Sequence, residues 1–184
     1  DAWIALPHIK RLLDSARNKG VPVIYTTAAF RPDGWDRGSW DWKNSRVGDW
    51  EPDAKVRQTN LDGNIINHEI EPHPQDIVIE KLKPSAFHGT PLSSFLTNFN
   101  ADSVILVGTT TSGCVRASVI DAFSENYHVA LAEEGCFDRS QASHAVNLCD
   151  MNAKYADVIS TDNVIEYIDG LEDGLFDLPS GTAA

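Results

Sequence analysis

The chain has 184 residues, and 42% of them are hydrophobic, which is enough for one core; we therefore expect a single domain over residues 1–184. With 15 basic and 27 acidic side chains, the net charge is −12, which disfavours binding to nucleic acids and to anionic membrane surfaces. No apolar run reaches the roughly 20 residues of a membrane span. Three cysteines do not make a disulfide framework, so we expect a cytoplasmic protein in a reducing compartment.

The first third of the chain predicts a helix, a strand and a long loop. Apolar residues recur at helical spacing over 9–16, and Gly20 is a C-terminal stop signal. Residues 21–29 predict a buried strand, because their apolar side chains are β-branched and nearly continuous. A polar loop follows over 31–61, and loops of that length are usually functional or disordered. Its tryptophans argue against disorder; they are Trp35, Trp40, Trp42 and Trp50.

The remaining chain alternates strands with helices. Strands are predicted at 76–82, 103–109, 128–132 and 157–160, and helices at 91–99, 114–124 and 140–156. Thr161 is expected to cap a last helix, and the tail 173–184 to be turn-like and flexible. This order predicts an α/β fold, with helices on both faces of a mostly parallel central sheet. In such folds, ligands bind beyond the carboxyl ends of the strands.

Cys114 lies where the strand 103–109 gives way to a helix. A helix N-terminus stabilises a thiolate, and its N–H groups can also bind an oxyanion. A free cysteine is also often a small buried apolar residue, so position alone leaves both roles open. Cys136 and Cys149 lack this setting, and we expect them to be structural.

Lys81 lies near the carboxyl end of the strand 76–82, among apolar residues. A lysine is unusual there unless its ammonium enters a functional cleft or meets a carboxylate; a solvated strand end is the simpler alternative. A cation close to a thiol lowers the pKa of the thiol. Lys81 and Cys114 at adjacent strand ends would therefore form a reactive pair.

Three longer segments resemble the isochorismatase-like cysteine hydrolases, and within them the N-carbamoylsarcosine amidase and biuret hydrolase branch. The segments are IEKLKPSAFHGTPL (79–92), ILVGTTTSGCVRASVIDAFSENY (105–127) and EEGCFDRSQASHAVNLCDMNAKYADVIST (133–161). The similarity runs from about Leu12 to Ile168, and TTSGCVR and SAF-GT are its most specific parts. It implies a three-layer αβα fold of Rossmann-like topology. It also implies hydrolysis of an amide or carbamoyl C–N bond without a cofactor, releasing ammonia.

The resemblance further implies a catalytic set of Cys, Lys and Asp. Cys114 matches the nucleophile that forms a thioester with the substrate carbonyl, and Lys81 matches the lysine that stabilises the charges of the set. A cis peptide bond is expected between Thr109 and Thr110. In the family, this bond turns the amides of Thr110 and Cys114 toward the substrate oxygen.

The aspartate of the set has no match in the chain. In the family it ends the first strand, ahead of the helix with which this chain opens. Counting back from Lys81 by the family interval passes Asp1, and reassigning the role to Asp1 or Asp14 would be forced. We therefore expect the chain to lack the family's first strand and, with it, the general base.

Arg139 matches an arginine that binds the substrate carboxylate in the carbamoylsarcosine enzyme, and an exposed arginine at a helix start is the alternative. Arg116 is expected to be a structural or interface partner. Aromatic side chains are candidates for the pocket wall, and equally for a subunit interface; they are Phe87, Trp35, Trp40 and Trp42.

No metal or nucleotide cofactor is expected. The nicotinamidase branch carries an Asp and His cluster after the second strand, whereas this chain reads AAFRPDGWDRGSW there. The histidines show no ligand spacing, and no GxGxxG or Walker motif is found; they are His8, His68, His73, His88, His128 and His144. The resemblance implies a small-molecule substrate and a homo-oligomer, either a dimer or a tetramer.

Two other functions stay open. An isochorismatase-type ether hydrolase does not need the cysteine, so the intact TTSGCVR segment counts against it. A non-catalytic binding or assembly module on the same fold is compatible with the unmatched aspartate.

Overall fold

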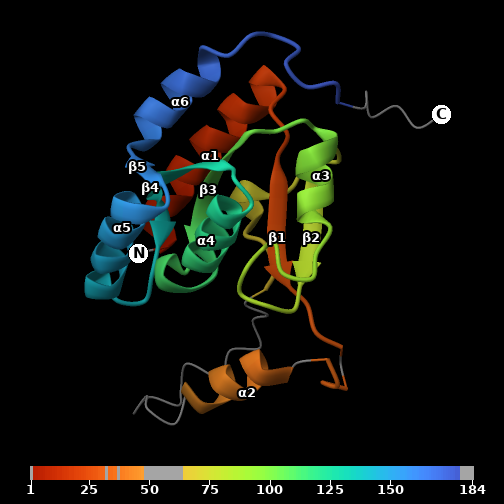
Figure 1. The fold of residues 1–184 in the computed structure, drawn as a ribbon, viewed down its shortest axis with the longest axis vertical. Helices are drawn as coiled ribbons and strands as arrows, with labels where there is room; N and C mark the ends of the chain where they lie inside the picture. Colours follow the sequence, from red (N-terminus) through yellow and green to blue (C-terminus); the bar gives the residue numbers. More distant parts are fainter. Residues whose placement is uncertain (1, 32, 37, 48–63, 179–184) are drawn as a thin grey trace, which may run out of the picture.

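The computed structural model describes residues 2–31, 33–36, 38–47 and 64–178 (Figure 1). Its helices are α1 (Ala2–Lys19), α2 (Gly38–Val47), α3 (Leu92–Asn98), α4 (Arg116–Ser124), α5 (Gln141–Lys154) and α6 (Thr161–Asp169). Its strands are β1 (Ile24–Ala28), β2 (Ile77–Lys81), β3 (Ser103–Thr109), β4 (His128–Phe137) and β5 (Asp157–Ile159). A 3-10 turn spans His68–Ile70, and a π-helical turn spans Thr111–Val115.

Every strand pairing in the described part of the chain is parallel, as predicted. β1 pairs with β2, and a second sheet has the order β3-β4-β5. The register between β3 and β4 shifts between Leu106 and Gly108, after which Thr109 lies opposite Phe137. Because of this renewed pairing, β4 extends beyond its predicted end at Ala132 and supports the last residue of β3.

Helices cover both faces of the second sheet. Leu131 and Ala132 are successive residues of β4 and therefore point to opposite faces. Leu131 packs in one apolar cluster with residues of α4 and α5, and Ala132 packs in another with residues of α1 and α6. This alternation confirms the predicted αβα layering.

The two sheets are not hydrogen-bonded to each other within the described residues. Figure 1 places β1 on the side of β2 that faces β3. No residue of β1 or β3 is fully buried, although their sequences predict buried strands; in contrast, β4 has five buried positions. The predicted single sheet is therefore present as two parts, because β1 and β3 each have a strand partner on one edge only.

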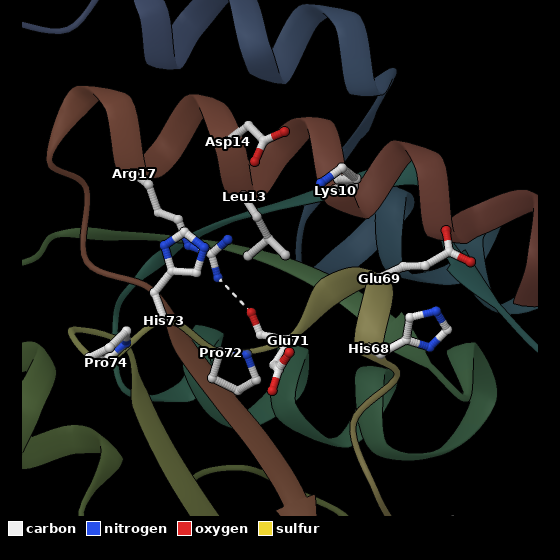
Figure 2. Close-up of a pocket in the computed structure, with 10 residues that line it drawn as sticks. All are labelled: Lys10, Leu13, Asp14, Arg17, His68, Glu69, Glu71, Pro72, His73 and Pro74. Carbon is white, nitrogen blue, oxygen red and sulfur yellow. Dashed lines mark hydrogen bonds between the residues drawn. The ribbon is translucent and has the colours of Figure 1, made fainter.

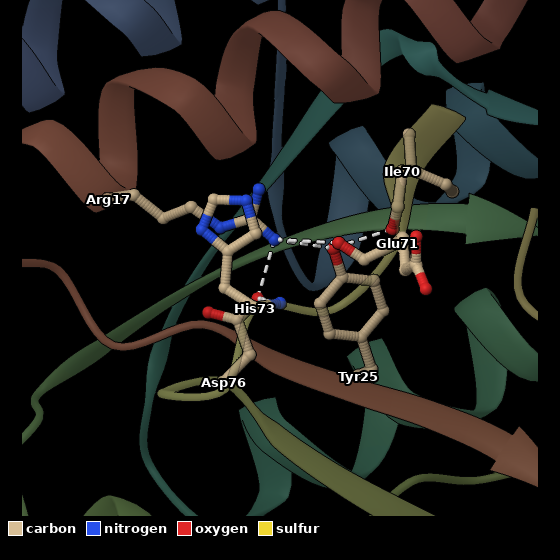
Figure 3. A network of polar contacts seen from close by, with 6 residues as sticks. All are labelled: Arg17, Tyr25, Ile70, Glu71, His73 and Asp76. Atoms are coloured by element: carbon tan, nitrogen blue, oxygen red, sulfur yellow. Dashed lines mark hydrogen bonds and ion pairs between the residues drawn. The ribbon is translucent and has the colours of Figure 1, made fainter. Parts of the chain in front are cut away.

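A polar network ties α1 to the two-stranded sheet (Figure 3). The guanidinium of Arg17 donates to the hydroxyl of Tyr25 at 3.0 Å, to the Glu71 carbonyl at 3.3 Å and to Asp76 at 2.5 Å. Tyr25 in turn donates to the Ile70 carbonyl at 2.9 Å. These contacts fix the end of α1, where Gly20 adopts the positive φ of 72° that stops the helix as predicted.

Two local predictions are corrected. Helix α2 lies within the stretch predicted as loop. The sequence does not predict this helix, because Trp40 and Trp42 are two positions apart and give no helical periodicity. The cap of α6 is Ser160, whose hydroxyl accepts from the N–H of Asn163, whereas Thr161 donates its hydroxyl to Glu134. Trp50 and the rest of 48–61 lie outside the described residues, as do 179–184.

None of the described helices combines the length and the apolar character that crossing a membrane requires.

Candidate active site

Lys81 ends β2, and its side chain is only 5% exposed. Its ammonium donates to the carbonyls of Lys83 and Pro84, at 3.0 and 2.9 Å, and to Sγ of Cys114 at 3.5 Å. An ammonium has three protons, so these three acceptors match its donors. Trp40 of α2 lies beside it, with Nζ 4.9 Å from the ring centroid. Lys81 is therefore held as a buried cation directed at the thiol.

Cys114 belongs to the π-helical turn Thr111–Val115, called the Cys114 turn below. Single π-helical turns occur frequently at functional sites. The carbonyl of Thr110 accepts from the N–H groups of Gly113 at 2.9 Å and Val115 at 3.2 Å. A Cβ at position 113 would lie 2.5 Å from Oγ1 of Thr110, so glycine is required there for the turn to close. The thiol is partly exposed, which leaves it accessible.

The peptide bond between Thr109 and Thr110 is cis, at the position that the family resemblance implies. It joins the end of β3 to the Cys114 turn.

Ser118 links the two motif segments that resemble the family, although sequence reasoning did not single it out. Its hydroxyl donates to the carbonyl of Cys114 at 2.7 Å and accepts from the N–H of Ala86 at 2.9 Å. Ser118 is buried on α4, four residues after Cys114. A serine four residues after Cys114 on a predicted helix was the sequence signal that could have identified it.

The sequence suggested that Lys81 and Cys114 lie at the ends of adjacent strands. Among the described residues β2 and β3 are not paired, yet the two side chains are in contact. The contact between the two candidate residues therefore depends on tertiary packing and not on neighbouring strands.

Arg139 follows β4 and is exposed. Its own N–H donates to Oδ1 of Asp138, and Oδ2 of that carboxylate accepts from the N–H of Ser112 in the Cys114 turn, both at 2.7 Å. Burial acts to raise the pKa of Asp138, but hydrogen bonds from Ser112 and Arg139 and the charge of Arg139 outweigh it, so that pKa is lowered. The backbone of Arg139 therefore lies close to the Cys114 turn, because the carboxylate of Asp138 binds both.

The remaining site candidates lie in different surroundings. Phe87 is 8% exposed and packs in the core, with its ring centroid 6.1 Å from that of Tyr127. Trp35 is 86% exposed. Arg116 donates to the amide oxygen of Asn147 at 2.6 Å, which is a structural contact.

A pocket of about 260 Å³ lies between α1 and the segment 68–74 (Figure 2). Both charge signs line it, with Lys10 and Arg17 on α1 and Glu69 and Glu71 opposite. It includes neither Cys114 nor Lys81, so the pocket does not belong to the candidate active site. Within the described ranges, no group of three or more His, Cys, Asp or Glu side chains is placed to hold a metal ion.

Comparison with known proteins assigns the chain to a family. The isochorismatase domain model matches residues 2–163. The chain belongs to the isochorismatase family. This isochorismatase-family chain is 36% identical over 170 residues to N-carbamoylsarcosine amidase of an Arthrobacter species, covering 90% of this chain but only 62% of that protein.

Two further comparisons bear on the fold and the relatives. Maleamate amidohydrolase of Pseudomonas putida is 30% identical over 160 residues, which cover 85% of this chain and 71% of that protein. The solved structure of a cysteine hydrolase from Pseudomonas syringae pv. phaseolicola superposes with a TM-score of 0.80 at 23% identity, covering 91% of this chain and 81% of that one. The isochorismatase-like αβα fold is thereby shown.

Proposed function

We propose that this protein hydrolyses a C–N bond of a small amide or carbamoyl compound through a thioester on Cys114. The observation that carries the proposal is the 3.5 Å contact between the buried ammonium of Lys81 and Sγ of Cys114. A cation at that distance favours the thiolate, which is the nucleophilic form. Both relatives described above, the N-carbamoylsarcosine amidase and the maleamate amidohydrolase, carry names of this reaction class.

In the proposed reaction, Sγ of Cys114 attacks the carbonyl carbon, and a C–S bond forms. The tetrahedral intermediate collapses with cleavage of the C–N bond, and the amine leaves as ammonia after taking up a proton. Water then attacks the thioester, releasing the acid and restoring the thiol. We assign the negative oxygen of the intermediate to the amides of Thr110 and Cys114, beside the cis peptide bond.

The thiol proton needs an acceptor, and Lys81 already donates in three directions. We assign this role to an aspartate on a strand that would lie between β1 and β3. The edges of β1 and β3 that are open among the described residues support the assignment, because a parallel strand there would join the two sheets. Replacing such an aspartate with Asn should abolish ammonia release, and unchanged release would contradict the assignment.

For the substrate, we propose a carboxylate-bearing compound similar to an N-carbamoyl amino acid. N-carbamoylsarcosine and maleamate both carry a carboxylate, and the exposed guanidinium of Arg139 is available at the same edge as Cys114. Trp35 and Phe87 remain proposed substrate contacts, and Trp40 joins them because its ring already lies at Lys81.

Ammonia release from a panel of N-carbamoyl amino acids, biuret, maleamate and nicotinamide tests the function. Cys114→Ala should abolish release, while Cys149→Ser, which changes an exposed cysteine, should leave it at the level of the unchanged protein. Full activity in Cys114→Ala would overturn the proposal. Preferential release from carboxylate-bearing compounds, lost in Arg139→Ala, would support the substrate class.

We also propose a cytoplasmic homo-oligomer, either a dimer or a tetramer. The described cysteines are all free, which suits a reducing compartment. Light scattering of the purified protein tests the assembly, and a monomer at micromolar concentration would contradict it.

A further inference from the structure

The segment after β4 contacts the Cys114 turn at two consecutive residues. Asp138 accepts from the N–H of Ser112 at 2.7 Å. Nδ1 of His144, in the first turn of α5, lies 2.8 Å from Oγ1 of Thr111, and Thr111 has no exposed surface. The first two residues of the turn are therefore held from one side.

Both oxygens of Asp138 are engaged, which fixes the plane of the carboxylate. Oδ1 accepts from the N–H of Arg139 and Oδ2 from that of Ser112. A carboxylate hydrogen-bonded to backbone N–H groups makes stronger bonds than a neutral acceptor does. The same side chain thus connects the backbone of Arg139 with the backbone two residues ahead of Cys114.

We propose that Asp138 is a positioning residue, which sets the direction of the Cys114 turn. The inference rests on the proposed function, in which Sγ of Cys114 must approach a carbonyl carbon along one direction. Displacing a reacting atom by about 1 Å can cost about 10²-fold in rate. Asp138 acts through Ser112, and the substrate contact is left to Arg139.

Three side chains from separate elements hold the Cys114 turn and its thiol. Lys81 donates to Sγ, Asp138 binds the amide of Ser112, and His144 contacts Thr111. Asp138 and His144 therefore hold the turn itself, whereas Lys81 contacts the thiol.

The test compares Asp138→Ala with Asp138→Asn in a Cys149→Ser background, so that Cys114 is the accessible thiol. Asp138→Ala should lower kcat about 10²-fold with little change in KM, and Asp138→Asn, which keeps an acceptor, should lose less. In Asp138→Ala, the rate constant of Cys114 alkylation by iodoacetamide at pH 8 should also change, because the carboxylate no longer holds the turn that carries the thiol. Glu133→Gln, which removes an exposed charge from β4, is the matched control and should change neither quantity.

Two outcomes separate this inference from the proposed function. An unchanged kcat, with an unchanged rate of Cys114 alkylation in both variants, would overturn the positioning role. Absence of ammonia release by the unchanged protein would instead overturn the proposed function, and the alkylation rate would still test Asp138. If Asp138→Ala fails to fold, Asp138→Asn carries both measurements.

Discussion

At the scale of single residues, Lys81 shows how a charged side chain is retained inside an apolar strand. Burying an unpaired ammonium would be costly, yet here two carbonyls and a sulfur accept its protons. The carbonyls belong to Lys83 and Pro84, in the turn that directly follows β2. The cation is thus stabilised locally, and its third proton is directed at Cys114.

The three cysteines should differ in reactivity for reasons that the structure gives. Burial is the main cause that raises the pKa of Cys136 to about 12, so this residue stays a thiol at neutral and mildly alkaline pH. Iodoacetamide at pH 8 should therefore label Cys149 and Cys114 and spare Cys136, because only the thiolate reacts.

Peptide mass spectrometry measures this labelling site by site. Labelling of Cys136 should rise only above about pH 11, as the thiol begins to ionise, or after unfolding in guanidinium. Modification of Cys136 in the folded protein at pH 8, as fast as that of Cys149, would contradict the burial.

At the scale of elements, α1 is attached to the two sheets by different means. Its apolar face packs against β4 and α6 through Leu12, whereas its C-terminal turn is held to β1 and β2 by the polar contacts of Arg17. Side-chain exposure is 16% for Arg17 and 5% for Asp76, so the ion pair between them is largely shielded from water.

Asp76→Ala should lower the free energy of unfolding by about 3 kcal/mol, because it leaves the guanidinium of Arg17 without its carboxylate. Urea denaturation followed by circular dichroism measures the change. Asp173→Ala is the matched control, because Asp173 pairs with Lys19 of the same helix at 2.7 Å but is 92% exposed. That variant should leave the midpoint nearly unchanged. Equal effects of the two substitutions would contradict the role of burial.

At the scale of the whole molecule, the described strands form two sheets, and β1 is not hydrogen-bonded to β3. The division explains why apolar strands such as residues 103–109 remain partly exposed, with Ile105 at 36%. It also lies beside the ends of the strands that deliver Lys81 and Cys114.

Hydrogen exchange measures this division directly. Amides of β1 and β3 that point away from β2 and β4 should exchange much faster than those of β4, which is paired on both sides. Equal protection of β1, β3 and β4 in the 184-residue chain would contradict the open edges.

Much of the fold follows from local patterns. Continuous β-branched runs predict β1 and β3, Gly20 predicts the end of α1, and the helical apolar spacing of Val164 and Ile168 predicts α6. These signals are short-range, because each depends on the spacing of residues along a single element. The motif segments add the chemical identity of Cys114 and Lys81 as candidates.

The sequence by itself determined Lys81 and Cys114 as candidates and the elements that present them. Only the tertiary structure decided that Lys81 reaches Cys114 across strands that are not neighbours, and that Asp138 binds the amide of Ser112. The physical reason is that these contacts join residues 33 and 26 positions apart. Hydrogen bonds of this kind depend on the packing of whole elements, which no local periodicity encodes.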